Sequence, residues 1–422
     1  MGPWLEATFS AFRERNFRVL WTGSFLAFLA FFMSTVVQAI VAYELTENNR
    51  SVGFVVFAQG IAQLLLGPFG GAMADRFPKR LVILVCQAVI TVSFFVVAVL
   101  IAGGAISIVS LAAASFLIGL AFSFLGPSRQ AFLMELVTPA KRGNAVALSQ
   151  VALNSSRIFG PMLAAVCLLF DSFGSAGAYF VMAGLYVGAM WTTVLLPRGD
   201  PVPGPARNVL GDIAEGVRYV WSVPRLRTLV LSYVLVIMVG FPYVTVMPGL
   251  VENEFNRSAG SVTILYTLNA AGGLLASLGV ASLADSPRAG SVYVIMALLF
   301  GGGLVAAGLS PNFWVVGGMM FILGFGAGGF QTLNGAIISH ITDPAYFGRV
   351  VSLTFLAFAA FAVVALPIGL LADEIGERAT LGVMGAGVCL IVGVFAVVGR
   401  GATRGEVAER PASLGPGPVQ GG

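Results

Sequence analysis

Charged side chains are scarce in this sequence. Asp, Glu, Lys and Arg together make up 10% of the 422 residues, whereas a typical soluble domain carries about 25%. Hydrophobic residues account for 58% of the chain. Because so little charge cannot cover a water-exposed surface, the composition excludes a soluble protein and indicates an integral membrane protein. We therefore expect the protein to be embedded in the lipid bilayer and not to bind nucleic acid.

Histidine and cysteine are also scarce. His340 is the only histidine, and Cys86, Cys167 and Cys389 each lie inside an apolar run. Cysteines placed in this way argue against a disulfide framework. One histidine cannot build a metal site of paired histidines, and no glycine-rich phosphate loop follows a strand. We therefore expect no metal and no cofactor, and we do not expect an enzyme.

Long runs without charge predict membrane helices, each of which needs about 20 mostly apolar residues. Two of the runs are long enough for two helices each, and one run is broken only by Arg157. The sequence therefore predicts an all-α integral membrane protein with twelve transmembrane helices. The runs are 19–43, 51–74, 81–128, 143–170, 172–197, 228–251, 258–284, 289–342, 350–372 and 379–399.

The longest polar interruption falls at the middle of the chain. It divides the sequence into a first six-helix half (1–197), a linker (198–227) and a second six-helix half (228–400). Inside the linker, the stretch NVLGDIAEGVRYVW has one apolar and one charged face, which predicts a helix lying on the membrane surface. We expect the polar, Gly- and Pro-rich tail (401–422) to be disordered.

The basic residues predict the orientation in the membrane. If both termini are cytoplasmic, most of the 23 Lys and Arg residues fall on the cytoplasmic side, as the positive-inside rule requires. We therefore expect a multi-pass protein of the cell (plasma) membrane, with both termini in the cytoplasm.

The two halves resemble each other in sequence. When the chain is shifted by 205 positions, AFLMELVTPAKRGNAVALSQVA from Ala131 aligns with AIISHITDPAYFGRVVSLTFLA from Ala336. Both stretches span the connection from the fourth to the fifth helix of their half, and Pro139 and Gly143 are among the residues that recur. Shared membrane composition would not keep polar loop residues in register. The pattern therefore predicts two six-helix repeats.

The connection between the second and third helices has the pattern Gly71-x-x-x-Asp75-Arg76-x-x-Lys79-Arg80. This pattern resembles the loop signature of the major facilitator superfamily, although Pro78 stands where that family usually has Gly. The stretches LGPSRQAFLMELVTPAKRGNAVAL and NFRVLWTGSF resemble the macrolide-efflux and enterobactin-exporter group within it.

The resemblance implies a gate on the cytoplasmic face that holds the two halves together when the protein is open outward. It also implies that Lys79 or Arg80 pairs with Glu135 at the end of the fourth helix. The alternative, in which the bases only obey the positive-inside rule, does not explain Asp75. The expected gate residues are Gly71, Asp75, Arg76, Lys79, Arg80, Arg129 and Glu135.

Arg157 is the clearest candidate for a functional side chain inside the membrane, where ionisable groups are costly. It either binds an anionic or hydrogen-bonding substrate, or it is a structural charge bonded to backbone carbonyls. Polar and aromatic residues on inward-facing helices complete the expected cavity. The cavity candidates are Gln38, Gln59, Gln63, Phe122, Asn154, Arg157, Tyr233, Tyr266, Asn269, Gln331, Asn334 and Phe358.

A proton-coupled transporter needs a carboxylate that can be reached from both sides. None of the 19 acidic residues falls at the predicted middle of the membrane. Glu44, at the outer end of the first helix, is the best candidate for proton coupling. Alternatively, it is simply solvated beside the outer loop.

These observations together predict a secondary active transporter that exports amphipathic small molecules, drug- or siderophore-like, by alternating access. An importer or a lipid flippase would share the same fold. A receptor that does not transport, or a membrane enzyme, is the alternative of a different class. The expected partners are a small-molecule substrate and protons as the coupling ion, and we expect a monomer.

Overall fold

The structure is a computed structural model that describes residues 10–70, 73, 76–170, 173–199, 209–281, 283, 286, 288–343 and 346–408. Within these ranges a few side chains, including that of Phe358, are not described. Every regular element in the described ranges is a helix. Gly71 and Asp75, two of the expected gate residues, lie outside the described residues.

The first half contains six long helices. They are α2 (Arg15–Glu44), α3 (Asn49–Leu66), α5 (Lys79–Ala102), α6 (Ile108–Leu136), α7 (Arg142–Leu168) and α8 (Gly174–Val194). Short 3₁₀ turns precede or extend them at η1 (Ser10–Arg13), η2 (Gly67–Phe69) and η3 (Pro139–Lys141).

The linker helix α9 (Val209–Ser222) connects the halves, and its existence confirms the amphipathic helix predicted there. The second half contains α10 (Pro224–Gly240), α11 (Tyr243–Gly249), η4 (Leu250–Glu254), η5 (Ala259–Ser261), α12 (Val262–Ala281), α13 (Ala289–Gly308), α14 (Phe313–Ile341), α15 (Phe347–Ile375) and α16 (Glu377–Ala408).

The predicted fold class is confirmed. Eleven stretches of the described chain are long and apolar enough to cross a membrane, with α10, α11 and η4 counted as one stretch. The 29-residue helix α15 is the twelfth long helix. One expectation needs correction: α16 continues to Ala408, so the described part of the tail is helical. Residues 409–422 lie outside the described residues.

Local sequence explains where several helices begin and turn. The side chains of Asn48, Ser107 and Asn312 cap α3, α6 and α14 by accepting a backbone N–H of the first turn, as short polar residues do at helix N-termini. Gly104 and Gly376 adopt φ values of 65° and 84°, which glycine permits at no steric cost. They form the tight connections α5–α6 and α15–α16.

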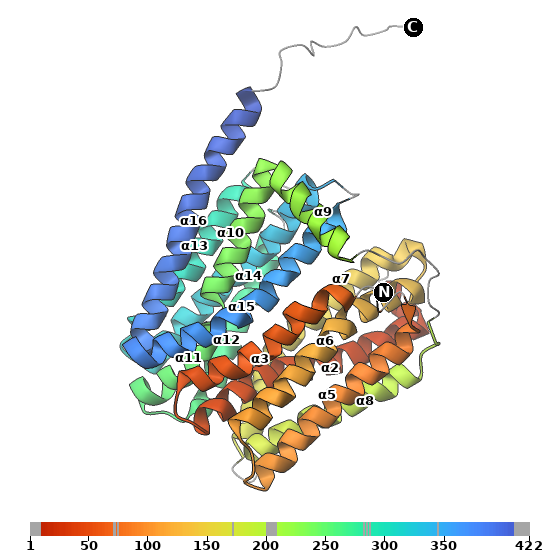
Figure 1. Ribbon diagram of the computed structural model, residues 1–422, viewed down its shortest axis with the longest axis vertical. Helices are drawn as coiled ribbons and strands as arrows, with labels where there is room; N and C mark the ends of the chain where they lie inside the picture. The colour runs from red at the N-terminus through yellow and green to blue at the C-terminus, as the bar shows by residue number, and fades with distance from the viewer. Residues whose placement is uncertain are drawn as a thin grey trace.

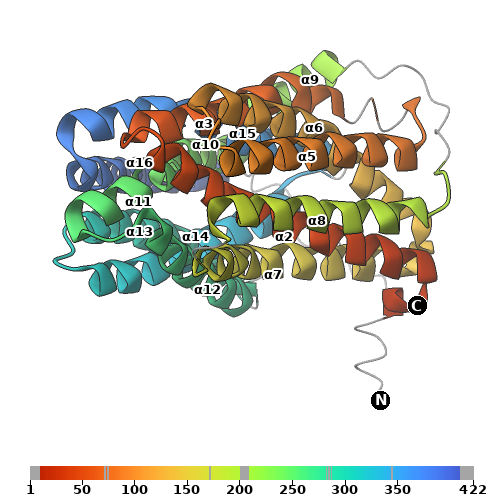
Figure 2. The ribbon, with the colours of Figure 1, turned by 90° about the horizontal axis from the view of Figure 1, so that it is seen from below.

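The repeat predicted from the sequence is also visible in the helix boundaries. Helix α14 begins and ends 205 positions after α6, and α15 begins 205 positions after α7. Figure 1 shows the two halves meeting where α3 lies along α15. Figure 2 shows the second contact between the halves, where α7 lies beside α12.

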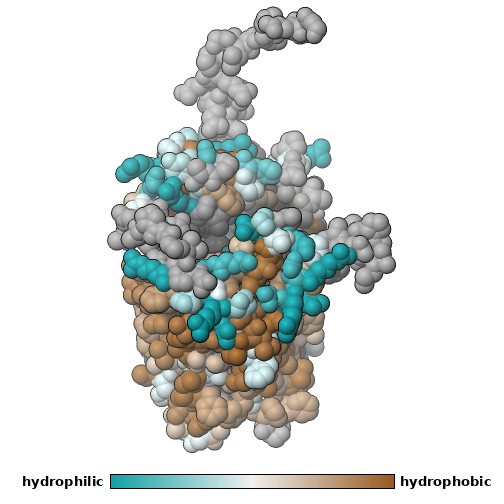
Figure 3. Space-filling model, turned by 90° about the vertical axis from the view of Figure 1, so that its right-hand side faces the viewer, coloured by the Kyte–Doolittle hydropathy of each residue, from teal (hydrophilic) through white to brown (hydrophobic). Residues whose placement is uncertain are grey.

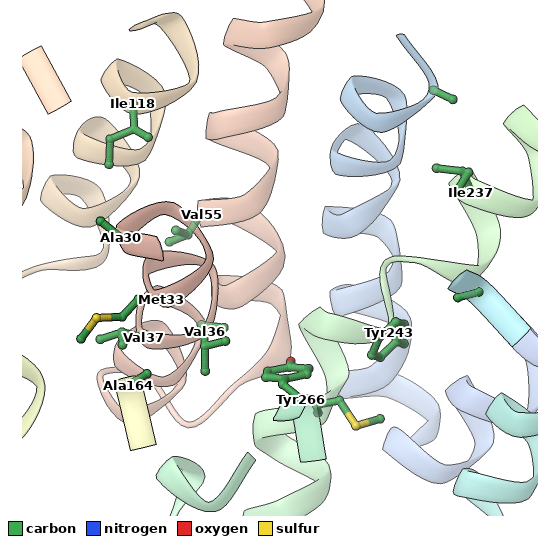
Figure 4. Packing of buried hydrophobic residues seen from close by; sticks show 14 of the residues in the cluster. Ala30, Met33, Val36, Val37, Val55, Ile118, Ala164, Ile237, Tyr243 and Tyr266 are labelled. Carbon is green, nitrogen blue, oxygen red and sulfur yellow. The ribbon is translucent and has the colours of Figure 1, made fainter. Parts of the chain in front are cut away.

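The surface is divided into an apolar band and polar ends. Figure 3 shows a broad hydrophobic region below hydrophilic residues that gather toward one end of the molecule. Exposed apolar side chains such as Val92, Trp191 and Leu390 would be costly in water but match the hydrocarbon core of a bilayer. Figure 4 shows the buried side chains at the boundary of the halves, with Met33 and Val36 on α2 and Tyr243 and Tyr266 on the second half.

Small residues let α3 and α15 approach closely. A Cβ atom placed at Gly53 would lie 2.5 Å from the Ala365 carbonyl oxygen, and one at Gly60 would overlap the Ala362 methyl group. Helices in lipid associate mainly through such close backbone packing, because lipid tails are as apolar as the side chains. This contact therefore holds the halves together along α3 and α15.

We expect Gly60→Ala to lower the melting temperature of the purified protein, because the added methyl overlaps Ala362. Overpacking of this kind costs about 1–3 kcal/mol. Gly67→Ala in the following turn is the matched control, since a Cβ atom there would meet nothing within 4 Å. A Gly60→Ala protein that melts no earlier than the Gly67→Ala protein would contradict the close packing of α3 on α15.

Candidate functional site

Arg157 lies deep inside the molecule, midway along α7. Its guanidinium sits 5.6 Å from the centre of the Phe32 ring. The hydroxyl groups of Tyr233 and Tyr243, which belong to the second half, are its electrostatic neighbours. Among the described residues it has no hydrogen-bond or ion-pair partner, and the side chain remains partly exposed, so it borders open space.

The seventh transmembrane segment is broken beside Arg157. Helix α10 ends at Gly240, and α11 begins at Tyr243 after a turn at Phe241 and Pro242. Proline has no N–H to donate and clashes with the preceding helical turn, which explains the break. The seventh membrane span predicted over 228–251 is therefore present, within Pro224–Glu254, but it is broken at Phe241 and Pro242. Broken helices in the membrane are tolerated where they line a cavity or a binding site.

Polar groups of the second half are joined in a network next to this break. The Tyr243 hydroxyl donates to Asn269 Oδ1 over 3.2 Å, and Asn269 Nδ2 donates to the Met320 carbonyl over 3.2 Å. The Tyr266 hydroxyl donates to the Val244 carbonyl over 3.0 Å. These hydrogen bonds fix the orientation of the Tyr243 and Tyr266 rings at the boundary of the two halves.

Two of the expected cavity residues bind each other inside the first half. Gln38 Nε2 donates to Gln59 Oε1 over 3.1 Å, and the Ser115 hydroxyl donates to Gln38 Oε1 over 3.0 Å. All three side chains are buried. The network joins α2, α3 and α6, which means that Gln38 and Gln59 have partners within one half.

The other cavity candidates differ in their surroundings. The Phe122 ring packs at a tilt on Phe31 with ring centres 4.2 Å apart. Asn334 is buried, and its Oδ1 atom has no hydrogen-bond partner among the described residues. Tyr233 is buried and stacks on Phe330. The half-buried candidates are Gln63, Asn154, Arg157, Asn269 and Gln331, whereas the Phe358 side chain lies outside the described residues.

The basic end of the bundle, where α5, α7 and α15 begin, carries the described gate residues. Lys79 forms a salt bridge with Glu135, as predicted. Its backbone N–H donates to the Gly199 carbonyl over 3.1 Å, and Arg80 Nη1 donates to the Leu196 carbonyl over 2.9 Å. These bonds join the start of α5 to Glu135 of α6 and to the backbone of Leu196 and Gly199 after α8, and Arg76 is exposed. In this structure the pairs therefore do not tie the halves together.

Arg129 is a buried part of the first half. It is 8% exposed and lies 4.9 Å from the centre of the Phe28 ring. Tyr186 of α8 is among its electrostatic neighbours, and its Nη2 atom has no hydrogen-bond partner among the described residues. Its position connects α6 to α2 and α8.

The linker helix α9 is attached to the second half. Glu215 pairs with Arg349 Nη2 over 3.1 Å. The Tyr219 ring stacks on Tyr346 with centres 4.2 Å apart, and the Tyr219 hydroxyl accepts the Asp343 backbone N–H. The linker is therefore anchored at the start of α15.

The opposite end, which we call the acidic end, is where α3 and α16 begin. Asp373 of α15 accepts the Asn49 N–H through Oδ1 over 2.7 Å and the Arg50 N–H through Oδ2 over 3.0 Å. These are the first two backbone donors of α3, which have no partner within their own helix. A carboxylate at this position also complements the positive end of the helix dipole. Asp373 therefore joins the two halves.

A second carboxylate reinforces this closure. Glu377 is 6% exposed, and its Oε1 atom accepts Asn49 Nδ2 over 2.9 Å and Asn253 Nδ2 over 2.7 Å. It thus links α3 of the first half to η4 and α16 of the second. Beside it, Arg378 Nε pairs with Glu254 over 2.5 Å.

Glu44, the predicted proton-coupling residue, is the last residue of α2 at the acidic end. It is exposed, and the carboxylate of Glu252 in the second half is its electrostatic neighbour. The structure therefore brings two like charges together across the boundary of the halves.

Sequence reasoning missed Asp373, Glu377 and Tyr243. The stretch ADEIGER around the α15–α16 connection is a cluster of charge between two apolar runs, which marks a helix end but not its partner. The Gly240–Phe241–Pro242 step would have predicted the break beside Tyr243.

Comparison with known proteins identifies a family. Residues 20–357 and 229–419 match the model of the Major Facilitator Superfamily. The chain is 23% identical to the staphyloferrin A transporter of Staphylococcus aureus, over 91% of this chain and 96% of that protein. It is 22% identical to macrolide efflux protein A of Streptococcus pyogenes, over 86% and 90%.

A third relative is the enterobactin exporter of Shigella boydii, with 25% identity over 79% of each chain. The solved structure of the nucleoside transporter NupG has a TM-score of 0.76 and 12% identity, covering 91% of this chain and 100% of that one. At this identity the structural likeness shows the fold alone. The resemblance predicted from the sequence is confirmed.

We expect Asp373→Asn to loosen the acidic end, because the amide keeps one acceptor for the α3 N-terminus but loses the charge. Exposed charges at helix ends contribute about 0.3–1 kcal/mol, enough to change the population of open molecules up to roughly fivefold. Spin labels at Ala105 and Leu309, on exposed connections of the two halves, would report a longer distance.

The labels require a background in which the three free cysteines are replaced. Glu374→Gln is the matched control, since it removes an exposed charge one residue further along the chain. Identical distance distributions for Asp373→Asn and Glu374→Gln would show that the carboxylate of Asp373 does not hold the halves together.

Proposed function

Because the chain belongs to the major facilitator superfamily, we propose that this multi-pass membrane transporter exports amphipathic small molecules by alternating access. The observation that carries the proposal is the asymmetry of the two ends. Asp373 and Glu377 bond across the halves at the acidic end, whereas Lys79 and Arg80 bond within the first half at the basic end. Arg157 lies between these ends.

We propose that the basic end faces the cytoplasm. The positive-inside rule supports this orientation, because short cytoplasmic connections carry the excess of Lys and Arg. In this orientation the structure is closed outward, and the linker helix α9 lies on the cytoplasmic side. An exporter in this state takes up cargo from the cytoplasm or the inner leaflet.

Export is favoured over import by the relatives. Macrolide efflux protein A and the enterobactin exporter are named for export. The aromatic rings of Phe32, Tyr233 and Tyr243 near Arg157 support an amphipathic cargo, since binding sites combine an apolar lining with a few fixed polar groups. The membrane-facing surface offers no comparable cation in the middle of the described helices.

We also propose that protons drive export through Glu44. The carboxylate of Glu252 in the second half is an electrostatic neighbour of Glu44. Other charged groups at the acidic end are Asp373, Glu377 and the Arg378–Glu254 pair. Ionised carboxylates repel one another when the acidic end closes, so a proton bound to Glu44 favours closure. In a cycle, the outward-open protein would release cargo, bind a proton at Glu44 and close, and the proton would leave to the cytoplasm while the basic end is open.

Transport is tested in proteoliposomes with fluorescent amphipathic dyes of cationic, neutral and anionic charge. We expect at least one dye to be moved by the purified full chain, and to be moved faster with a pH gradient than without. Absence of flux for every dye, with folded protein confirmed by its melting curve, would contradict the proposed function.

Glu44→Gln should remove the dependence on the pH gradient but keep downhill exchange of the dye, because the amide cannot bind a proton and cargo binding is distant. Glu47→Gln in the adjoining connection, where the side chain is also exposed, is the control and should retain gradient dependence. Gradient dependence that survives in Glu44→Gln would move the proton site elsewhere.

A further inference from the structure

We infer that the cargo carries an anionic group, a carboxylate, which binds the guanidinium of Arg157 while its apolar body packs on the aromatic rings around it. The inference rests on the proposed transport function and adds the chemical class of the cargo. It depends on the unmet donors of Arg157, on the absence of a counter-charge nearby, and on the aromatic groups from both halves.

The donors of Arg157 are unmet. A guanidinium carries five N–H donors and cannot be neutralised at physiological pH. Within the described chain its guanidinium contacts the Phe32 ring, which offers a π face and no lone pair. A cation that is removed from bulk water without hydrogen-bond partners is costly. Water or an anion must therefore meet these donors, and the partly exposed side chain leaves room for either.

None of the described side chains near Arg157 is negative. Every acid with a described side chain lies at or near a helix end, in a connection, or on the linker helix α9. The electrostatic neighbours of Arg157 are Tyr233 and Tyr243 and no carboxylate. The potential at this point is therefore positive, which attracts an anion and repels a cationic drug.

The aromatic groups define the rest of the cargo. Phe32 comes from α2, whereas Tyr233 and Tyr243 come from opposite sides of the break between α10 and α11. Tyr233 is held by stacking on Phe330, with ring centres 5.2 Å apart, and Tyr243 by its bond to Asn269. Rings fixed in this way offer flat apolar contact at little entropic cost.

A carboxylate fits this site better than other polar groups. The planar guanidinium presents parallel N–H donors that match the two oxygens of a carboxylate. Arg157 belongs to the first half and the two tyrosines to the second, so a cargo that touches both spans the boundary that alternating access opens and closes. Binding would thus be sensitive to the conformational state.

The experiment compares two probes that share a naphthalene ring and carry opposite charges, 2-naphthoate and the (2-naphthylmethyl)trimethylammonium ion. Equilibrium dialysis against the purified full chain in detergent measures their affinities. We expect 2-naphthoate to bind at least 10-fold more tightly than the ammonium probe. If it binds no more tightly, including the case in which neither probe binds, the inference is wrong.

The role of Arg157 is tested with Arg157→Gln, which should lower the affinity for 2-naphthoate about 10- to 100-fold, the loss expected for a charge-assisted hydrogen bond. Arg157→Lys keeps the charge but lacks the parallel N–H donors of the guanidinium, and it should lower the affinity less than Arg157→Gln. Arg257→Gln is the matched control, because Arg257 lies at the acidic end against Phe313. Unchanged affinity in Arg157→Gln would overturn the assignment.

A structural role for Arg157 predicts a different outcome. In that case Arg157→Gln and Arg157→Lys would have lower melting temperatures, and their affinity for 2-naphthoate per folded molecule would be unchanged. Equilibrium dialysis measures binding without transport. The proposal of transport and the inference about the cargo can therefore be contradicted separately. Anion binding without any dye flux would contradict the transport function alone, and flux with no preference for 2-naphthoate would contradict only the cargo class.

Discussion

The cost of an unpaired polar group in lipid is the constraint on which this structure depends. It requires helices wherever the chain crosses the bilayer, and it explains why polar side chains within the first half, such as Gln38 and Gln59, bond to each other. Arg157 is an exception, since the described chain offers it an aromatic ring and no hydrogen-bond acceptor. A costly exception of this kind indicates function.

The same constraint makes the two ends of the bundle unequal. At the basic end, Lys79 and Glu135 satisfy each other within the first half, so these bonds do not resist separation of the halves. At the acidic end, Asp373 satisfies backbone donors of α3 across the boundary. The described carboxylates therefore join the halves at the acidic end, whereas the Lys79–Glu135 pair lies within one half.

Much of the fold follows from local sequence. Charge-free runs predict the helices, because hydropathy is a property of short segments. The interruption at Pro242 was missed because the surrounding run has no charge, although proline marks a break. The helical extension to Ala408 was missed because its composition, rich in polar residues, resembles that of a linker.

The sequence by itself determined the membrane-spanning class, the long helices and the repeat, and it singled out Arg157 as a charge inside an apolar run. Each of these can be recognised along the chain without knowing which helix faces meet. The sequence also predicted that Lys79 or Arg80 pairs with Glu135, through a family resemblance. Only the tertiary structure decided that Asp373 meets the start of α3 and that Arg157 faces Tyr243. These partners are far apart in sequence, and helix packing alone sets which faces meet.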